Sequence, residues 1–128
     1  MTDPIHIEED VILIKVPKFY HEGISDKKLY EITRGVWRIG PRREKARFAF
    51  SIFEGEIKAA YEIHSWHKAF TTEYTERTDL EMLSDEFLQK RHEFLGTISN
   101  EMQNKYIGKS VKKCFRGSSA PFVYCNCE

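Results

Sequence analysis

A two-residue alternation of apolar and polar side chains between residues 47 and 66 is the clearest pattern in the sequence. Phe48, Phe50 and Ile52 fall on one side of the first arm, which is the period of a β-strand. Glu54 and Gly55 then fit a tight turn. The second arm places Trp66 on the side opposite to Ile57, Ala59, Tyr61, Ile63 and Ser65. The segment therefore predicts a β-hairpin with strands over residues 47–53 and 56–66.

Three further segments have the composition of strands. Residues 11–16, VILIKV, form a β-branched run that ends at Pro17. Residues 91–98 place Phe94 inside and Gly96 at a bulge. Residues 121–125 form a last short strand, whereas residues 67–80 are polar and rich in threonine, which predicts a long loop.

Helix signals separate these strands. Ser25 can cap a helix over residues 26–34, and Gly35 suits the left-handed position after its end. Pro41 suits the first position of a helical turn, PRREKA. Three more helical segments are predicted: residues 85–89 with Ser84 as cap, a helix through Tyr106 that Ser99 or Asn100 caps and Gly108 ends, and a turn over residues 109–115.

The resulting order is strand, helix, helical turn, two strands, helix, strand, helix and strand. Five short strands separated by three or four short helices indicate an α+β fold, a small and mostly antiparallel five-stranded β-barrel. A chain of 128 residues is long enough for one domain. We expect residues 11–128 to form that domain and the polar residues 1–10 to be a flexible N-terminus.

Charge is balanced in total but not along the chain. The 20 basic and 20 acidic residues give a net charge of zero, which argues against an overall electrostatic attraction between the protein and DNA. Residues 34–47 nevertheless contain a single acid, Glu44, among the basic residues Arg34, Arg38, Arg42, Arg43, Lys45 and Arg47. A second basic run consists of Lys105, Lys109, Lys112, Lys113 and Arg116.

Trp37 lies inside the first basic cluster, between Gly35 and Gly40. A tryptophan in such a loop can stack on a base, and each such stacking contact contributes about 1–3 kcal/mol to binding. Arginine can form a bidentate hydrogen-bonded contact with a phosphate or with the edge of a guanine. A core position is the alternative for Trp37. Trp66 offers a second aromatic wall, and the triplet Gly-Lys-Ser at 108–110 offers N–H groups and a lysine to a phosphate. The predicted ligand-binding residues are Arg34, Trp37, Arg38, Arg42, Arg43, Lys45, Trp66, Lys109, Ser110 and Lys113.

Signals for metal or cofactor chemistry are weak. Cys125 and Cys127 are separated by one residue, so they do not form the CxxC unit of a zinc knuckle, although Cys114 could join them in space. Inert thiols are the favoured interpretation. His64 and His67 are three residues apart and point to opposite faces of a strand. Neither the P-loop nor the dinucleotide-binding glycine motif occurs, and we expect neither a metal nor a cofactor.

Three cysteines without a signal peptide indicate a reducing compartment. The longest apolar run, residues 11–14, is far too short to cross a membrane. We therefore expect a cytoplasmic protein without membrane association.

The phrases LYEITRGVW, REKARFAF, NKYIGKSV and PFVYCN resemble a bacterial domain that is often appended to GIY-YIG and other restriction-type nucleases. The likeness covers residues 11–126. The order of strand, short helix, tryptophan loop, basic turn, strand and hairpin is also similar to the PUA-like superfamily, which includes the ASCH, EVE and YTH domains. That resemblance implies a small barrel with an aromatic pocket for a base, often a modified one. Where the bacterial domain has NPI, this chain has Ala120, Pro121 and Phe122, so an asparagine that could read a ligand is missing.

These observations favour a module that binds nucleic acid or a nucleotide through an aromatic and arginine-rich pocket, with a nuclease or another defence-system component as a further partner. A protein-interaction or inhibitor module of phage or defence type is the first alternative. The second alternative is a nucleic-acid-processing enzyme with Glu44, His64 or Lys109 at its site.

Overall fold

The computed structural model describes residues 6–16, 20–69, 71–75, 91–115 and 120–127. In chain order its elements are β1 (Val11–Lys15), α1 (Asp26–Arg34), β2 (Trp37–Arg38), the 3-10 helix η1 (Pro41–Lys45), β3 (Phe48–Phe53), β4 (Glu56–Lys68), β5 (Arg91–Ile98), α3 (Asn100–Tyr106), the 3-10 helix η3 (Lys112–Phe115) and β6 (Phe122–Cys125). The predicted helix over residues 85–89 lies outside the described residues. Within them, no helix is both long and apolar enough to cross a membrane.

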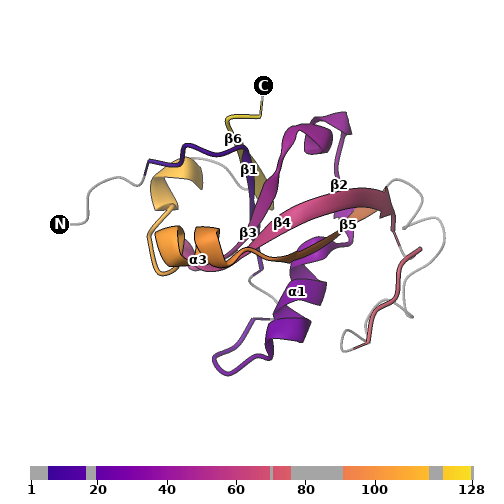
Figure 1. The fold of residues 1–128 in the computed structure, drawn as a ribbon, viewed down its shortest axis with the longest axis horizontal. Coiled ribbons are helices and arrows are strands. Elements are labelled where there is room, and N and C mark those ends of the chain that lie inside the picture. The colour runs from indigo at the N-terminus through magenta and orange to yellow at the C-terminus, as the bar shows by residue number, and fades with distance from the viewer. Residues whose placement is uncertain (1–5, 17–19, 70, 76–90, 116–119, 128) are drawn as a thin grey trace.

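The described strands form one curled sheet in the order β2-β5-β4-β3-β1-β6, a half-barrel with β2 and β6 at its edges (Figure 1). Neighbouring strands are antiparallel except β1 and β3, which are parallel. The α+β class and the mostly antiparallel sheet are confirmed. The predicted five-stranded barrel is corrected to a six-stranded mixed half-barrel, because Trp37 and Arg38 add the short edge strand β2.

Both faces of the sheet are covered, which explains the unbroken apolar run of β1. Residues 11–14 are completely buried, as expected for a parallel strand with a layer on each side. Leu13 faces a core that includes Met102 and Tyr106 of α3. Ile12 faces a second core that includes Leu29 of α1. Helices α3 and α1 therefore cover opposite faces of the sheet.

The predicted hairpin is confirmed and is longer than expected, because β4 continues to Lys68. Its turn residues Glu54 and Gly55 both have positive φ, 51° and 76°. Two consecutive left-handed residues give the turn a twist that matches that of the flanking strands. The turn chemistry and the strand period therefore agree on the same hairpin.

Strand β4 contains two irregularities that the simple alternation misses. Its register shifts once against β3, skipping Lys58, and once against β5, skipping His64 opposite Leu95 and Gly96. Each extra residue reverses the face of the side chains that follow. Trp66 therefore packs against the same core as Ala59 and Tyr61, so its predicted position opposite these two residues is wrong. Ile57, which precedes both bulges, faces the other core, as predicted relative to Trp66.

Gly96 is needed because of a close approach, not because of its φ angle. A Cβ atom at this position would collide with the backbone carbonyl of Glu62 on β4. We expect Gly96→Ala to lower the free energy of unfolding by about 1–3 kcal/mol, the usual range for overpacking. Urea unfolding monitored by circular dichroism measures this loss. Gly40→Ala is the matched control, since its Cβ would meet nothing within 4 Å, and an equal loss in both variants would contradict the prediction.

The ends of α1 show one success and one failure of local rules. The Ser25 hydroxyl accepts a hydrogen bond from the Lys28 N–H at 3.1 Å, as predicted for the cap. Gly35 has φ −173°, so the predicted left-handed position is wrong. Glycine is required there for space, because a Cβ would lie 2.5 Å from the Tyr74 hydroxyl and 2.7 Å from the Glu93 Cβ.

Residues 6–10, part of the predicted flexible N-terminus, are tied to α3 and to the end of β6. Ile7 is buried, and the Asn126 side chain donates to the carbonyls of Ile7 and Glu9 at 2.9 Å each. The Glu9 carboxylate accepts hydrogen bonds from Lys105 at 2.7 Å and from Tyr106 at 2.5 Å. These contacts hold residues 6–10 against the C-terminal end of α3.

The Glu9 contacts predict a pH dependence of stability. Burial raises the pKa of Glu9, but hydrogen bonds from Lys105 and Tyr106 outweigh it and hold the pKa below its usual 4.5. A carboxyl with a lowered pKa stabilises the fold above its unfolded pKa and loses this contribution as pH falls through the folded value. We expect Glu9→Gln to lose less stability than the wild type on acidification below about pH 4.5, measured by urea unfolding. Glu8→Gln, which removes an exposed carboxylate 3.6 Å from Lys105, is expected to follow the wild-type curve more closely.

Candidate functional site

Both tryptophans lie on one face of the sheet, at the end where β2, β5 and β4 run side by side. Trp37 pairs with His92 and Trp66 pairs with Phe94, so the two rings flank β5. Both are half-buried. The Trp37 indole N–H donates to the Thr33 carbonyl at 2.7 Å, and the Trp66 ring packs edge-on against Phe94 at 5.3 Å between centroids. The two predicted aromatic walls therefore belong to one surface, held on strands and not on a free loop.

Arg34, the first residue of the predicted basic cluster, is an internal residue. Its side chain is 2% exposed and lies 3.7 Å from the Glu93 carboxylate. It donates to the Thr72 hydroxyl at 2.6 Å and to the Glu73 carbonyl, and its guanidinium stacks on the Tyr74 ring at 3.7 Å. The structure thus separates Arg34 from the other arginines and uses it to join α1, β5 and residues 72–74.

The 3-10 helix η1 links β2 to the end of the chain. Arg42 donates to the Cys127 carbonyl at 2.8 Å and lies over the Tyr124 ring at 4.6 Å. Arg43 donates to the Ile39 carbonyl at 3.4 Å. The helix therefore lies across the gap between the two edges of the curled sheet. Arg38, Arg42 and Lys45 are exposed, whereas Arg43 is half-buried.

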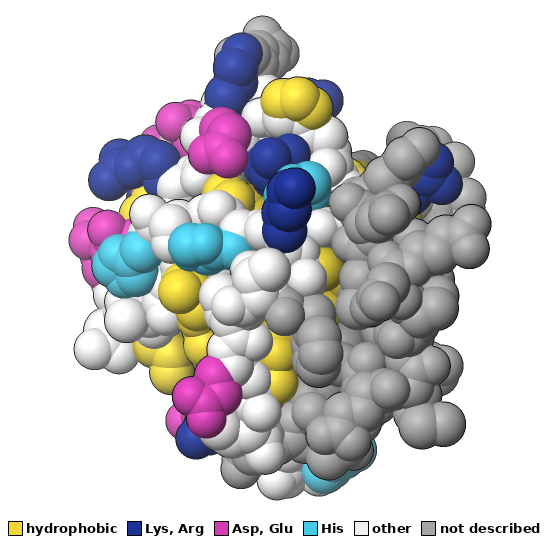
Figure 2. All heavy atoms as spheres, turned by 90° about the vertical axis from the view of Figure 1, so that its right-hand side faces the viewer, with side chains coloured by type: hydrophobic (Ala, Val, Ile, Leu, Met, Phe, Trp, Pro, Cys, Tyr) yellow, Lys and Arg dark blue, Asp and Glu magenta, His cyan; other side chains and the backbone are white. Residues whose placement is uncertain are grey.

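Three basic residues of this end were missed from the sequence: Lys68, Arg91 and His92. Lys68 pairs with His92 across β4 and β5, and Arg91 pairs with Arg38 across β5 and β2. Figure 2 faces this end of the molecule and shows Lys, Arg and His side chains close together in the middle and upper part of the view. Their one sequence signal is that the predicted strand over residues 91–98 begins with two basic residues.

The charges at this end perturb one another. Burial lowers the pKa of His92, and the nearby cations Arg43 and Lys68 lower it further from its usual 6.5. Burial and the neighbouring Arg38 lower the pKa of Arg91. Like charges that crowd each other are stabilised by an anion that neutralises them.

Several buried nitrogens at this end have no hydrogen-bond partner within the described part of the chain. They are Arg43 Nε, Trp66 Nε1 and His92 Nδ1, and the Tyr124 hydroxyl has none either. The Glu44 carboxylate lies 3.6 Å from Arg43 Nε, beyond hydrogen-bond length. A buried polar group without a partner costs about 1–3 kcal/mol. An oxygen that reaches these groups would therefore be bound favourably.

The second predicted basic group is at the other end of the sheet. Ser110 forms a bridge with Glu56, the first residue of β4, whereas Trp66 lies ten residues further along that strand. Ten residues span about 33 Å when extended. Lys109, Ser110 and Lys113 are exposed, but the structure does not bring them to the tryptophans.

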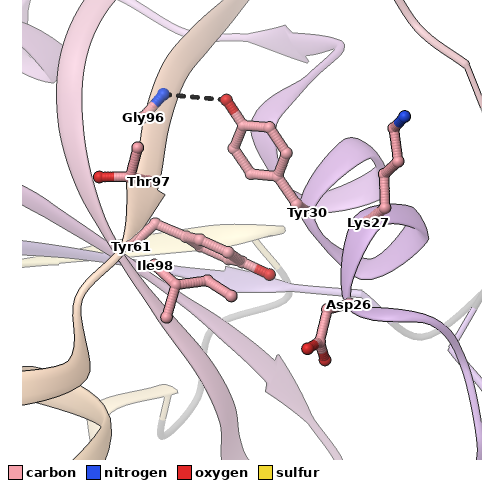
Figure 3. A pocket seen from close by; sticks show the side chains of 7 residues that line it. All are labelled: Asp26, Lys27, Tyr30, Tyr61, Gly96, Thr97 and Ile98. Carbon is pink, nitrogen blue, oxygen red and sulfur yellow. Dashed lines mark hydrogen bonds between the residues drawn. The ribbon is translucent and has the colours of Figure 1, made fainter.

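A small open pocket that sequence reasoning missed lies between the first turn of α1 and the end of β5 (Figure 3). Its volume is about 250 Å³, and its lining consists of Asp26, Lys27, Tyr30, Tyr61, Gly96, Thr97 and Ile98. The Tyr30 hydroxyl accepts a hydrogen bond from the Gly96 N–H at 2.9 Å, and the ring centroids of Tyr30 and Tyr61 are 5.3 Å apart. Tyrosines at 30 and 61 carry no local signal, because they meet only when α1 packs on β4.

The cysteines do not form a common metal site. Cys114 and Cys125 pack against one core, and Cys127 is buried in the other. Burial, and then contact with Cys114, raises the pKa of Cys125 to about 12. Among the described residues, no group of three or more His, Cys, Asp or Glu side chains is arranged to hold a metal ion.

The end of the sheet at β2, β5 and β4 therefore combines two aromatic rings, a group of cations and unused hydrogen-bonding nitrogens. Comparison with protein-family models, with curated proteins and with solved structures found no match to this chain.

Proposed function

We propose that this protein binds single-stranded nucleic acid or a nucleotide at what we term the mouth surface. This surface consists of Trp37, Arg38, Arg43, Trp66, Lys68, Arg91 and His92. The proposal keeps the aromatic and arginine-rich pocket expected from the sequence, but leaves out Arg34, Arg42, Lys45 and the second basic group.

The observation that carries the proposal is that the two tryptophans of the sequence flank β5 on one face, Trp37 beside His92 and Trp66 beside Phe94, next to a local excess of cations. Among the described residues, two acids adjoin this surface: Glu44, which is exposed, and Glu93, which is buried against Arg34. Phosphate groups attract such cations, and a tryptophan can stack on any base. The bases must be unpaired for stacking, so a single strand or a free nucleotide fits better than a duplex.

The neutral net charge supports a local mode of binding. A protein with 20 basic and 20 acidic residues has no overall attraction for a polyanion, so affinity must come from the mouth surface itself. The resemblance to PUA-like domains supports the same class of ligand and adds the expectation of a modified base. The nuclease or defence-system partner likewise remains part of this proposal.

Intrinsic fluorescence tests the proposal directly, because Trp37 and Trp66 are the two tryptophans of the sequence. We expect short single-stranded DNA or RNA to change the emission in a saturable way and to bind more weakly as salt rises. The slope of log affinity against log salt is about −0.7 per phosphate contacted. Titrations of Trp37→Phe and Trp66→Phe then show whether each remaining indole responds.

Unmethylated and base-methylated oligonucleotides of one sequence test the modified-base expectation, which predicts tighter binding of the methylated strand. Emission that no oligonucleotide or nucleotide changes would overturn the proposal. Capture of a stoichiometric protein partner by a chain that binds no oligonucleotide would favour the protein-interaction alternative. Metal-dependent cleavage of DNA or RNA that Glu44→Ala abolishes would favour the enzyme.

A further inference from the structure

The pocket of Figure 3 is a preformed slot with apolar walls. Tyr61 is 1% exposed and Tyr30 is half-buried, and both rings pack near Phe94, at 6.4 and 6.2 Å between centroids. The Gly96 N–H holds the Tyr30 hydroxyl in place, and the aliphatic side chain of Ile98, 41% exposed, adds to the wall. Aromatic and aliphatic walls of this kind favour a flat ring over a charged group.

The size of the pocket limits what can enter. Pockets for drug-sized ligands have volumes of about 300–1,000 Å³. At about 250 Å³, this pocket accommodates one ring system and leaves any attached sugar or phosphate outside.

The polar groups of the pocket define the edge of that ring. Asp26 lines the opening, and in Figure 3 the Tyr61 hydroxyl points toward its carboxylate. The Tyr30 hydroxyl accepts from the Gly96 N–H and lies on the other side of the pocket, away from Asp26 (Figure 3). The pocket thus presents the two-oxygen acceptor of Asp26 at its opening.

Among the common bases, guanine complements this carboxylate best. Its pairing edge carries two adjacent N–H donors, which a carboxylate can accept together. Adenine, cytosine and uracil each offer a carboxylate a single donor group on that edge. A carboxylate therefore discriminates in favour of guanine.

Lys27 is the cation of the lining. Figure 3 shows its side chain extending from the same helical turn as Asp26 but to another side of the opening. A lysine at the rim can pair with a phosphate that stays outside the pocket. A cationic ligand would use Asp26 but would be repelled by Lys27, so a nucleotide makes better use of the lining.

We propose that the pocket between α1 and β5 binds the base of a guanine nucleotide, with Tyr30 and Tyr61 as walls, Asp26 on the two N–H donors and Lys27 near the phosphate. The inference rests on the proposed nucleotide-binding function and adds a second, base-selective site to it. This site is separate from the mouth surface, because Phe94 fills the space between Trp66 and the two tyrosines.

The test is a nuclear magnetic resonance titration of the full chain with GMP, AMP, CMP and UMP, followed at the backbone amides. We expect GMP to shift the amides of Gly96, Thr97 and Ile98 and to bind about tenfold more tightly than AMP. Guanosine is expected to bind more weakly than GMP, because it lacks the phosphate that Lys27 contacts.

Asp26→Asn is expected to abolish the preference for GMP over AMP. Its matched control is Glu101→Gln, because Glu101 is the first-turn acid of α3 as Asp26 is of α1, and both changes remove a similar helix-dipole interaction. Thermal unfolding of both variants is the control for an intact fold, and we expect a cooperative transition in each. An unchanged preference in Asp26→Asn would overturn the assignment of Asp26.

The outcomes separate this inference from the proposed function. If oligonucleotides change the tryptophan emission but GMP shifts none of the three amides, the inference fails and the mouth surface stands. If GMP shifts these amides while oligonucleotides leave the emission unchanged, the pocket stands and the mouth surface fails. Equal affinity for all four nucleotides, or binding of arginine amide in place of GMP, overturns the inference.

Discussion

Arg34→Ala is expected to lower the free energy of unfolding by about 3–5 kcal/mol, the usual cost of removing one member of a buried ion pair. The Arg34 and Glu93 side chains are 2% and 0% exposed, so neither charge can turn to water when its partner is lost. The change also removes the hydrogen bond to Thr72 and the stacking on Tyr74. Urea unfolding monitored by circular dichroism measures the loss.

Arg38→Ala is the control for this prediction. Arg38 belongs to the same basic cluster but is exposed, and its replacement is expected to change stability by no more than about 0.5 kcal/mol. A stable Arg34→Ala variant that has lost nucleic-acid binding would contradict the internal role of Arg34 and return it to the ligand-binding set.

The double variant Arg38→Gln with Lys68→Gln is expected to bind single-stranded nucleic acid about tenfold more weakly than the wild type near physiological salt. Both residues are exposed, so the fold should be unaffected, and both lie at the mouth surface. Each phosphate contact contributes about 0.7 to the slope of log affinity against log salt, so the loss of two contacts should reduce the magnitude of that slope by about 1.4. Fluorescence titrations over a series of salt concentrations measure both quantities.

Lys109→Gln with Lys113→Gln is the matched control, because it removes the same net charge from exposed residues at the other end of β4. We expect it to leave the salt slope unchanged. If this control weakened binding as much as the mouth variant, the ligand would follow the whole length of the sheet, and the basic group near Gly108 would rejoin the site as the sequence predicted.

Much of the fold could be predicted because its signals are local. The hairpin follows from a two-residue period and a turn in which Glu54 and Gly55 take left-handed angles. Ser25 marks the start of α1 by its own hydroxyl, and Ser99 does the same for α3 with a bond from the Met102 N–H at 3.3 Å. Each of these features depends on residues within four positions of one another.

The failures concern features that depend on distant neighbours. The bulge at His64 in β4 reverses the facing of the side chains after it, so the alternation alone misplaces Trp66 relative to Tyr61. Gly35 looks like a helix-terminating residue but is required by the approach of Tyr74 and Glu93. The edge strand β2 has two residues, too short to show any period, and exists because β5 pairs with it.

The candidate site shows the same division. Trp37, Arg38, Arg43 and Trp66 were identified from the sequence by residue type and spacing. Lys68 and His92 are paired across two strands whose joining segment is more than twenty residues long, so no local pattern connects them. Tyr30 and Tyr61 likewise form a pocket only through the packing of α1 against the sheet.

The sequence by itself determined the hairpin, the two capped helices, the α+β class and the concentration of aromatic and basic residues between positions 34 and 66. These properties follow from the period of side chains and from turn and cap chemistry, which act over a few residues. The tertiary structure alone decided which of those residues share a surface. It buried Arg34 against Glu93, moved the Lys109 group to the far end of β4, and joined Asp26 and Tyr30 to Tyr61. The physical reason is that burial and charge pairing depend on packing between elements far apart in the chain, and that one extra residue in a strand reverses every face after it.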